Sequence, residues 1–180
     1  MDLYIHVDRG RQLASGDVIE LERYRREESR LMLLAPCLDA EFVRHLERLM
    51  EEGISLHGAQ YLLMPQQKPD FDSMAIELAY EAYRAKHCPE QPSRLQAFFA
   101  FADIADAVRF CGDTSCIYRV RSQAAAHKYD MNALKLSYDP QQQEAYAARY
   151  WRGEPLSMDA TYQPQWEILL TLPVEIVSRV

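Results

Sequence analysis

The amino-acid sequence predicts an α+β domain with mainly antiparallel strands. Strand patterns stand at both ends of the chain, an aromatic strand pattern lies in the middle, and helical patterns are inserted between them. Strands and helices do not alternate as they do in folds built from parallel βαβ units, so antiparallel pairing is expected. We expect residues 1–180 to form a single domain with a helical insertion at about 36–92, because no flexible linker isolates that region.

The N-terminal region predicts two short strands. Residues 3–7 alternate between apolar and polar side chains, which places His6 on the polar face of the first strand. A turn then leads to a second extended stretch at residues 18–21. The mixed-charge run at residues 23–30 is more typical of a solvated face or loop than of a basic docking patch.

The inserted region predicts two helices. Asp39 is a good N-cap for a helix that runs to about Glu52 and ends at Gly53. A polar, proline-containing link at residues 65–72 separates it from a second helix at about 73–87.

The second half of the chain returns to strands. It predicts a strand at 95–101, a helix at 104–110 capped by Asp103, strands at 116–121 and 127–131, and a helix at 141–152 capped by Asp139. The chain then ends in an expected strand pair, 168–172 and 174–177, with Pro173 as the break between them.

Composition and charge exclude several classes of protein. A net charge of −7 and a pI near 5.2 argue against general nucleic-acid binding, which needs a basic surface. The four cysteines lack the spacing of a metal site, so free thiols and no metal are expected. No leader pattern and no membrane-spanning run are recognisable, so we expect a cytoplasmic protein without a membrane partner, although secretion as an effector by a non-classical route is compatible.

Few motifs point to chemistry. The sequence has no dinucleotide-binding GxGxxG, P-loop, GxSxG or HExxH pattern. What remains is a sparse set of polar and aromatic side chains on or beside expected strands. Each also has a purely structural interpretation, as a packed ring, a turn anchor or an exposed strand-edge charge. The set is His6, Arg9, Ser93, Arg94, Phe98, Phe99 and Glu167.

The order of short motifs along the chain resembles a bacterial family of uncharacterised domains. The resemblance covers nearly the whole chain except about 36–75, and the order of the motifs is more specific than any one of them. The matching stretches are Tyr4-Ile5-His6-Val7-Asp8-Arg9, Leu13 with Gly16-Asp17-Val18-Ile19, Pro92-Ser93-Arg94-Leu95, Phe98-Phe99-Ala100-Phe101 with Asp106-Ala107 and Phe110, Ile117-Tyr118-Arg119-Val120, Asp130-Met131-Asn132, Tyr150-Trp151-Arg152-Gly153-Glu154 and Trp166-Glu167-Ile168-Leu169.

The layout of these motifs looks like the ADP-ribosyltransferase fold. That resemblance implies a split, strongly bent antiparallel β-sandwich with helices around an NAD cleft. One constellation of that superfamily is a His on the first strand, an aromatic on a middle strand and a Glu opening a late strand, matched here by His6, Phe98 or Phe99, and Glu167. The middle aromatic is usually Tyr rather than Phe. Gln165-Trp166-Glu167 fits the Gln-x-Glu turn of another subclass, whose Ser-Thr-Ser strand is absent.

The resemblance implies an NAD-dependent ADP-ribosyltransferase acting on an unidentified macromolecular acceptor. Glu167 would be the catalytic carboxylate, because cleavage of the nicotinamide–ribose bond passes through an oxocarbenium-like state that a fixed negative charge stabilises. Phe98 or Phe99 would stack on nicotinamide. His6 would hydrogen-bond the adenosine ribose, and Arg9 would pair with the pyrophosphate. Ser93 and Arg94, just ahead of the aromatic strand, would complete the NAD site.

Two alternatives remain open at this stage. The first is a catalytically degenerate scaffold that binds a partner protein through the 36–92 helices, using Tyr80, Tyr83 and Leu62-Leu63-Met64. The second is a phosphate-handling activity on RNA ends, which would require Arg9, Arg94, Arg119 and Arg121 to converge on one pocket.

Overall fold

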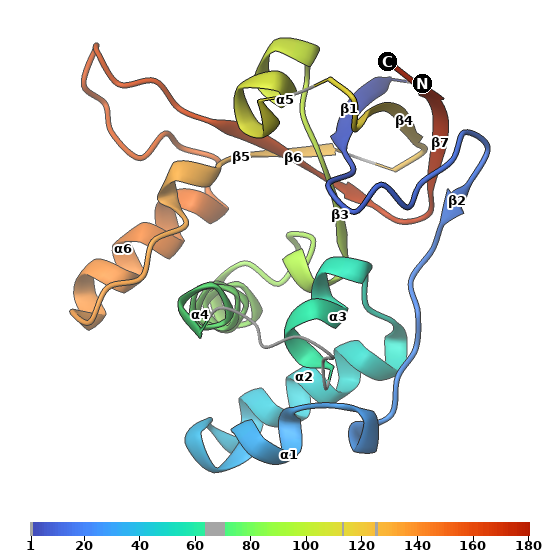
Figure 1. Cartoon of the computed structure of the whole chain (residues 1–180). Coiled ribbons are helices and arrows are strands. Elements are labelled where there is room, and N and C mark those ends of the chain that lie inside the picture. Colours follow the sequence, from blue (N-terminus) through green and yellow to red (C-terminus); the bar gives the residue numbers. More distant parts are fainter. Residues whose placement is uncertain (1, 64–70, 113, 125) are drawn as a thin grey trace.

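The protein is an α+β chain with two antiparallel sheets. The computed structural model describes residues 2–63, 71–112, 114–124 and 126–180. Figure 1 shows the strands gathered at one end of the molecule, with helices α1 to α4 together at the other. The strands are β1 (Leu3–Val7), β2 (Val18–Ile19), β3 (Ala97–Ala100), β4 (Ile117–Ser122), β5 (Ala126–Asp130), β6 (Trp166–Thr171) and β7 (Val174–Arg179). Their orders are β1-β4-β7-β2 in one sheet and β3-β6-β5 in the other.

The helices begin and end where local sequence signals favour it. They are α1 (Leu31–Leu34), α2 (Ala40–Glu52), α3 (Leu56–Leu62), α4 (Phe71–His87), α5 (Ile104–Cys111) and α6 (Pro140–Trp151), with short 3₁₀ turns η1 (Arg26–Glu28), η2 (Ala35–Cys37), η3 (Arg94–Gln96) and η4 (Met131–Ala133). The predicted N-caps are confirmed, because the side chains of Asp39, Asp103 and Asp139 each accept a hydrogen bond from the first turn of α2, α5 and α6.

The inserted region contains more helix than predicted. Helix α3, which the sequence reading missed, begins at the Ser55 N-cap between the two predicted helices. Most of the expected 65–72 link lies outside the described residues, and its last two residues are already part of α4. The predicted strand at 95–101 is also shorter, because the Ser93 hydroxyl accepts from the Leu95 N–H and starts the turn η3.

Both expected C-terminal strands are present, but the expectation that they pair with each other is wrong. Strand β6 pairs with β3 and β5, whereas β7 pairs with β4 and β2, so the chain crosses from one sheet to the other at Leu172 and Pro173. The two strands contribute instead to one core shared by both sheets. Ile168 and Leu170 of β6 belong to the same buried cluster as Val174 and Ile176 of β7. Burial of apolar faces by both sheets thus decides where each strand lies.

A backbone bridge between Ile5 and Phe101 also joins the two sheets. The Ile5 N–H donates to the Phe101 carbonyl at 2.9 Å, and the Phe101 N–H donates back to Ile5 at 2.6 Å. This bridge brings β1, and with it His6, beside the end of β3. In the described part of the chain, no helix is both long enough and apolar enough to cross a membrane.

The contact between α3 and η3 predicts a specific intolerance at Gly58. A Cβ built on this glycine would run into the Leu95 carbonyl oxygen and lie 3.0 Å from the carbonyl carbon. Gly58→Ala should therefore lower the free energy of unfolding by about 1–3 kcal/mol, as overpacking does. Urea denaturation at neutral pH measures the change.

Gly10→Ala is the matched control, because the nearest atoms to its added Cβ lie at an ordinary 3.5 Å. We expect it to stay within about 0.5 kcal/mol of the wild type. Equal stability of the two variants would contradict the close approach at Gly58.

Candidate functional site

Glu167 lies on the face of the three-stranded sheet that packs against helices. It is the second residue of β6, and Leu169, two positions on, is buried with Tyr129 and Tyr150 in the core between this sheet and α4 and α6. Alternation along a strand puts Glu167 on that same face. Only 4 % of Glu167 is exposed, so its carboxylate is held inside the protein rather than at a solvated strand edge.

Arg94 lies between two buried carboxylates. Its Nε and Nη2 each donate to Glu77 of α4 at 2.9 Å, a planar bidentate contact, while its Nη1 donates to Glu167 Oε1. Burial lowers the pKa of Arg94, but the charges of Glu167 and Glu77 outweigh it and hold that pKa well above its ordinary value. The guanidinium therefore stays charged and fixed in position.

Tyr150 completes the contacts of Glu167. Its hydroxyl donates to Glu167 Oε1 at 2.6 Å and accepts from Arg94 Nη1. Burial raises the pKa of Tyr150 well above the ordinary value, so the phenol remains a proton donor. Three elements far apart in sequence, η3, α6 and β6, thus meet at one carboxylate oxygen.

Phe99 brings an aromatic face to the same place. The Arg94 guanidinium carbon lies 4.8 Å from the centre of the Phe99 ring, and the His57 ring of α3 lies 4.4 Å from that centre. His57 Nε2 is 3.0 Å from Glu77 Oε1. We call the group formed by His57, Glu77, Arg94, Phe99, Tyr150 and Glu167 the Glu167 cluster.

Phe98 lies on the other face of β3, where the ring of His6 from β1 packs against it. Phe98 packs in the core between the sheets, and its ring centre is 4.2 Å from that of His6. His6 Nδ1 lies 2.7 Å from the Phe99 carbonyl oxygen and donates a hydrogen bond to it, since a carbonyl can only accept. Burial lowers the pKa of His6, the largest of several effects, so the ring is neutral at pH 7 and Nε2 is the acceptor nitrogen.

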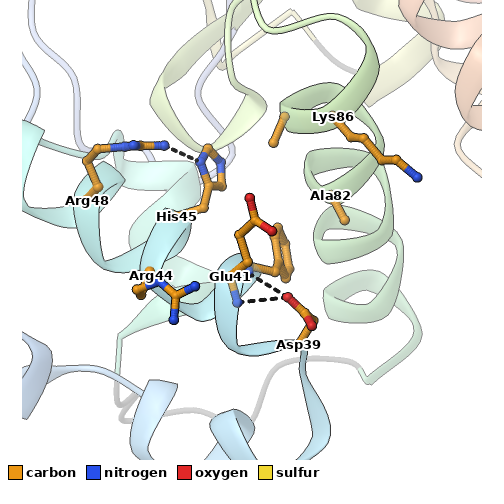
Figure 2. A pocket seen from close by; sticks show the side chains of 9 residues that line it. Asp39, Glu41, Arg44, His45, Arg48, Ala82 and Lys86 are labelled. Carbon is orange, nitrogen blue, oxygen red and sulfur yellow. Dashed lines mark hydrogen bonds between the residues drawn. The ribbon is translucent and has the colours of Figure 1, made fainter.

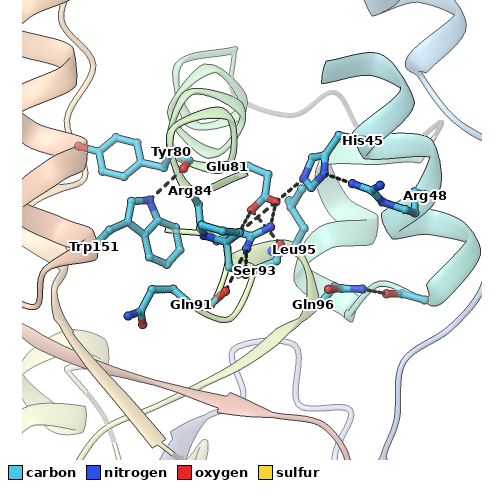
Figure 3. A network of polar contacts seen from close by, with 12 residues as sticks. His45, Arg48, Tyr80, Glu81, Arg84, Gln91, Ser93, Leu95, Gln96 and Trp151 are labelled. Atoms are coloured by element: carbon cyan, nitrogen blue, oxygen red, sulfur yellow. Dashed lines mark hydrogen bonds and ion pairs between the residues drawn. The ribbon is translucent and has the colours of Figure 1, made fainter. Parts of the chain in front are cut away.

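Ser93 belongs to a second polar network, the Glu81 network, shown in Figure 3. Its hydroxyl donates to Glu81 Oε2 at 2.8 Å, and the Arg84 guanidinium contacts both oxygens of Glu81. His45 Nε2 lies 2.8 Å from Glu81 Oε1, and Arg48 Nη2 lies 3.1 Å from His45 Nδ1. Burial raises the pKa of Glu81, but the bonds from His45 and Arg84 lower it below the ordinary value.

The remaining arginines of the sequence analysis lie apart from one another. Arg9 is exposed, with its guanidinium 4.1 Å from the centre of the Phe110 ring of α5. Arg121 pairs with Glu175 of β7 at 2.6 Å, and Arg94 is enclosed by its two carboxylates. The convergence that a phosphate-handling site would require is therefore not formed by Arg9, Arg94 and Arg121.

The sequence did not single out three members of the Glu167 cluster as site residues, namely His57, Glu77 and Tyr150. Glu77 and Glu81 are four residues apart on α4, in line with Met74 and Leu78, which are buried. Carboxylates within a buried helical stripe need partners, and that signal was available. His57 had no such signal, because α3 was not predicted. Tyr150 was noted only as part of a short motif.

The docking residues of the scaffold alternative are mostly internal. Tyr80 and Leu62 are fully buried, and Tyr83 is partly buried with its ring 4.5 Å from that of His87. Met64 lies outside the described residues. Among the described residues, no three or more His, Cys, Asp or Glu side chains converge as metal ligands would.

The chain belongs to a family whose description is "Protein of unknown function (DUF2441)", which it matches over residues 4–180. The family match covers β1 to β7, so both sheets, the inserted helices and the Glu167 cluster fall within it. No match was found among curated proteins.

The lowered pKa of Glu77 predicts a dependence of stability on pH. Burial raises this pKa, but the charges of Arg94 and His57 outweigh it and hold the pKa well below the ordinary value. A carboxylate of this kind stabilises the fold fully above its unfolded pKa, about 4.3, and loses that contribution as the pH falls toward the folded pKa. The stability difference between wild type and Glu77→Gln should therefore be largest near pH 7 and shrink below about pH 4.

Urea unfolding at pH 7, 5, 4 and 3 measures this difference. Glu144→Gln is the control, since Glu144 is exposed on α6 and carries the same change of charge. A difference between wild type and Glu77→Gln that stays constant from pH 7 to 3 would contradict the ionised state of Glu77.

Proposed function

We propose that this protein is an NAD-dependent ADP-ribosyltransferase, which cleaves the nicotinamide–ribose bond and transfers ADP-ribose to a macromolecular acceptor. The resemblance of its motifs to that superfamily sets the reaction class, and Glu167 is the proposed catalytic residue. The two antiparallel sheets are compatible with the fold that this proposal requires.

One observation carries the proposal: inside the Glu167 cluster a planar cation, the guanidinium of Arg94, lies beside both an aromatic ring and a carboxylate. Arg94 lies over the Phe99 ring and pairs with Glu167, while Tyr150 bonds to both. The nicotinamide ring of NAD is also planar and positively charged. An aromatic face beside a fixed carboxylate is suited to hold it, by stacking and by charge. In the proposed reaction the nicotinamide ring takes the place beside Phe99 and Glu167 that the Arg94 guanidinium fills in this structure, so NAD binding has to displace Arg94 from Glu167.

The chemistry follows from the placement of the carboxylate. As the bond from ribose C1′ to nicotinamide breaks, its electron pair neutralises the leaving ring and positive charge develops on the ribose. Glu167, already fixed by the Tyr150 hydroxyl, stabilises that charge without rearrangement. The acceptor forms the new bond at C1′ and releases its proton toward this carboxylate.

The other predicted NAD contacts divide into two groups. His6 is omitted from the proposed contacts because its ring packs against Phe98, on the face of β3 opposite the Glu167 cluster. Arg9 is exposed beyond the end of β1 and is assigned to the pyrophosphate. Ser93 is omitted from the proposed contacts because its hydroxyl donates to Glu81, and Phe98 because it faces the core between the sheets.

The second candidate is a scaffold that has lost catalysis. The observation that favours it is the closure of the Glu167 cluster, in which Glu167 is 4 % exposed and Arg94 is held by Glu77 as well. A scaffold of this kind would use the two carboxylates only to hold η3 against α4 and β6.

Release of nicotinamide decides between the two. Purified protein with NAD, assayed by chromatography with and without cell extract, should release nicotinamide, and Glu167→Gln should lower the rate by about 10²–10³-fold. Glutamine keeps the size of the side chain and an acceptor oxygen for Tyr150, and Arg94 keeps its pairing with Glu77; circular dichroism checks that the variant is folded.

Glu175→Gln is the matched control, because Glu175 pairs with Arg121 on the other sheet and should leave turnover unchanged. Full turnover in a folded Glu167→Gln variant would remove Glu167 from its role. Absence of nicotinamide release by the wild type in every condition would favour the scaffold.

A further inference from the structure

A cavity lies between α2 and α4, away from the Glu167 cluster. Its volume is about 720 Å³, within the range of about 300–1,000 Å³ that small-molecule sites occupy. Figure 2 shows Glu41 and His45 projecting from α2 into the space that faces α4. The lining residues are Asp39, Glu41, Phe42, Arg44, His45, Arg48, Ala82, Ala85 and Lys86.

Cations outnumber carboxylates in the lining, with Arg44, Arg48 and Lys86 against Asp39 and Glu41. Asp39 accepts hydrogen bonds from the backbone of Glu41 and Phe42, and Glu41 stands in the first turn of α2. The partial positive charge of the helix N-terminus, roughly half a unit charge, offsets part of the charge of these two carboxylates. Arg44, Arg48 and Lys86 form no ion pair with any other described residue. Three unpaired cations at one cavity contrast with the overall charge of −7.

The Glu81 network fixes the charge state of the inner wall. Arg48 can only donate a hydrogen bond, so His45 Nδ1 must accept it, and the proton of a neutral His45 lies on Nε2, facing Glu81. Glu81 is already paired with Arg84. No carboxylate of this network therefore neutralises Arg48, and its positive charge is available to the cavity.

The cavity also offers a flat wall beside these charges. The rings of Phe42 and His45 are nearly parallel, at 18°, with centres 6.0 Å apart, and Ala82 and Ala85 line the α4 side without bulk. Arg44 and Lys86 are exposed and flexible, so both can turn toward a bound anion.

We propose that the cavity between α2 and α4 is a binding site for a small phosphorylated molecule, held by Arg44, Arg48 and Lys86. Guanidinium groups match phosphate oxygens geometrically, and the lysine adds a mobile point charge. This site is independent of the proposed transferase activity, because none of its lining residues belongs to the Glu167 cluster.

Isothermal titration with inorganic pyrophosphate at low salt tests the site. The wild type should bind it saturably, and Arg48→Gln should weaken binding about tenfold, the loss expected for one charge-assisted hydrogen bond. Arg44→Gln with Lys86→Gln should abolish binding. Glutamine at position 48 can still donate to His45, so the fold should persist, which circular dichroism checks.

Two control variants locate the bound anion. Arg23→Gln makes the same change of charge at an exposed position outside the cavity and should bind as the wild type does. Arg9→Gln removes the pyrophosphate contact of the proposed NAD site, so a saturable binding component that persists in this variant and is weakened in Arg48→Gln belongs to the cavity. Loss of binding in Arg9→Gln with full binding in Arg48→Gln would overturn the proposal, as would no saturable binding by the wild type. The proposal would also be overturned if the protein bound polyglutamate but did not bind pyrophosphate, a result that would favour an acidic protein partner.

Discussion

The pairing of Arg94 with Glu77 and Glu167 connects three elements that are distant in sequence. Through it, η3 is held against α4 on one side and β6 on the other, and Tyr150 adds α6. A buried charge of this kind is costly unless it is fully paired, and breaking such a pair typically destabilises by about 3–5 kcal/mol. The helical region and the three-stranded sheet are therefore held together by charge as well as by apolar packing.

Much of the local structure could be predicted from the sequence because its causes are local. Asp39, Asp103 and Asp139 bond to the turns that follow them, and Gly112 adopts the left-handed conformation in which a helix readily ends. The course of the chain after Leu172 could not be predicted in this way. Whether β7 returns beside β6 or crosses to β4 depends on which core buries Val174 and Ile176, and residues distant in sequence decide that.

In the candidate site, too, the local features could be predicted from the sequence, whereas the contacts between distant residues could not. Phe98 and Phe99 are equivalent in sequence, and only their opposite faces on β3 separate the ring that meets Arg94 from the ring that meets His6. The position of Glu167 at the start of a strand was read from the motif order, but its partners were not. They come from α4 and α6, and the register between a strand and a helix packed on it has no short-range signal.

Glu77 and Glu81 also determine how α4 is seated. They lie one turn apart on this helix, about 6 Å along its axis, and their partners Arg94 and Ser93 are neighbours in sequence. A single contact would act as a pivot around which a helix can rotate or slide. Two contacts at different heights along the helix restrict both its rotation and its sliding. If α4 slid by one turn, one glutamate could meet the other's partner, but the second would be left buried and alone, so the helix has only one stable axial position.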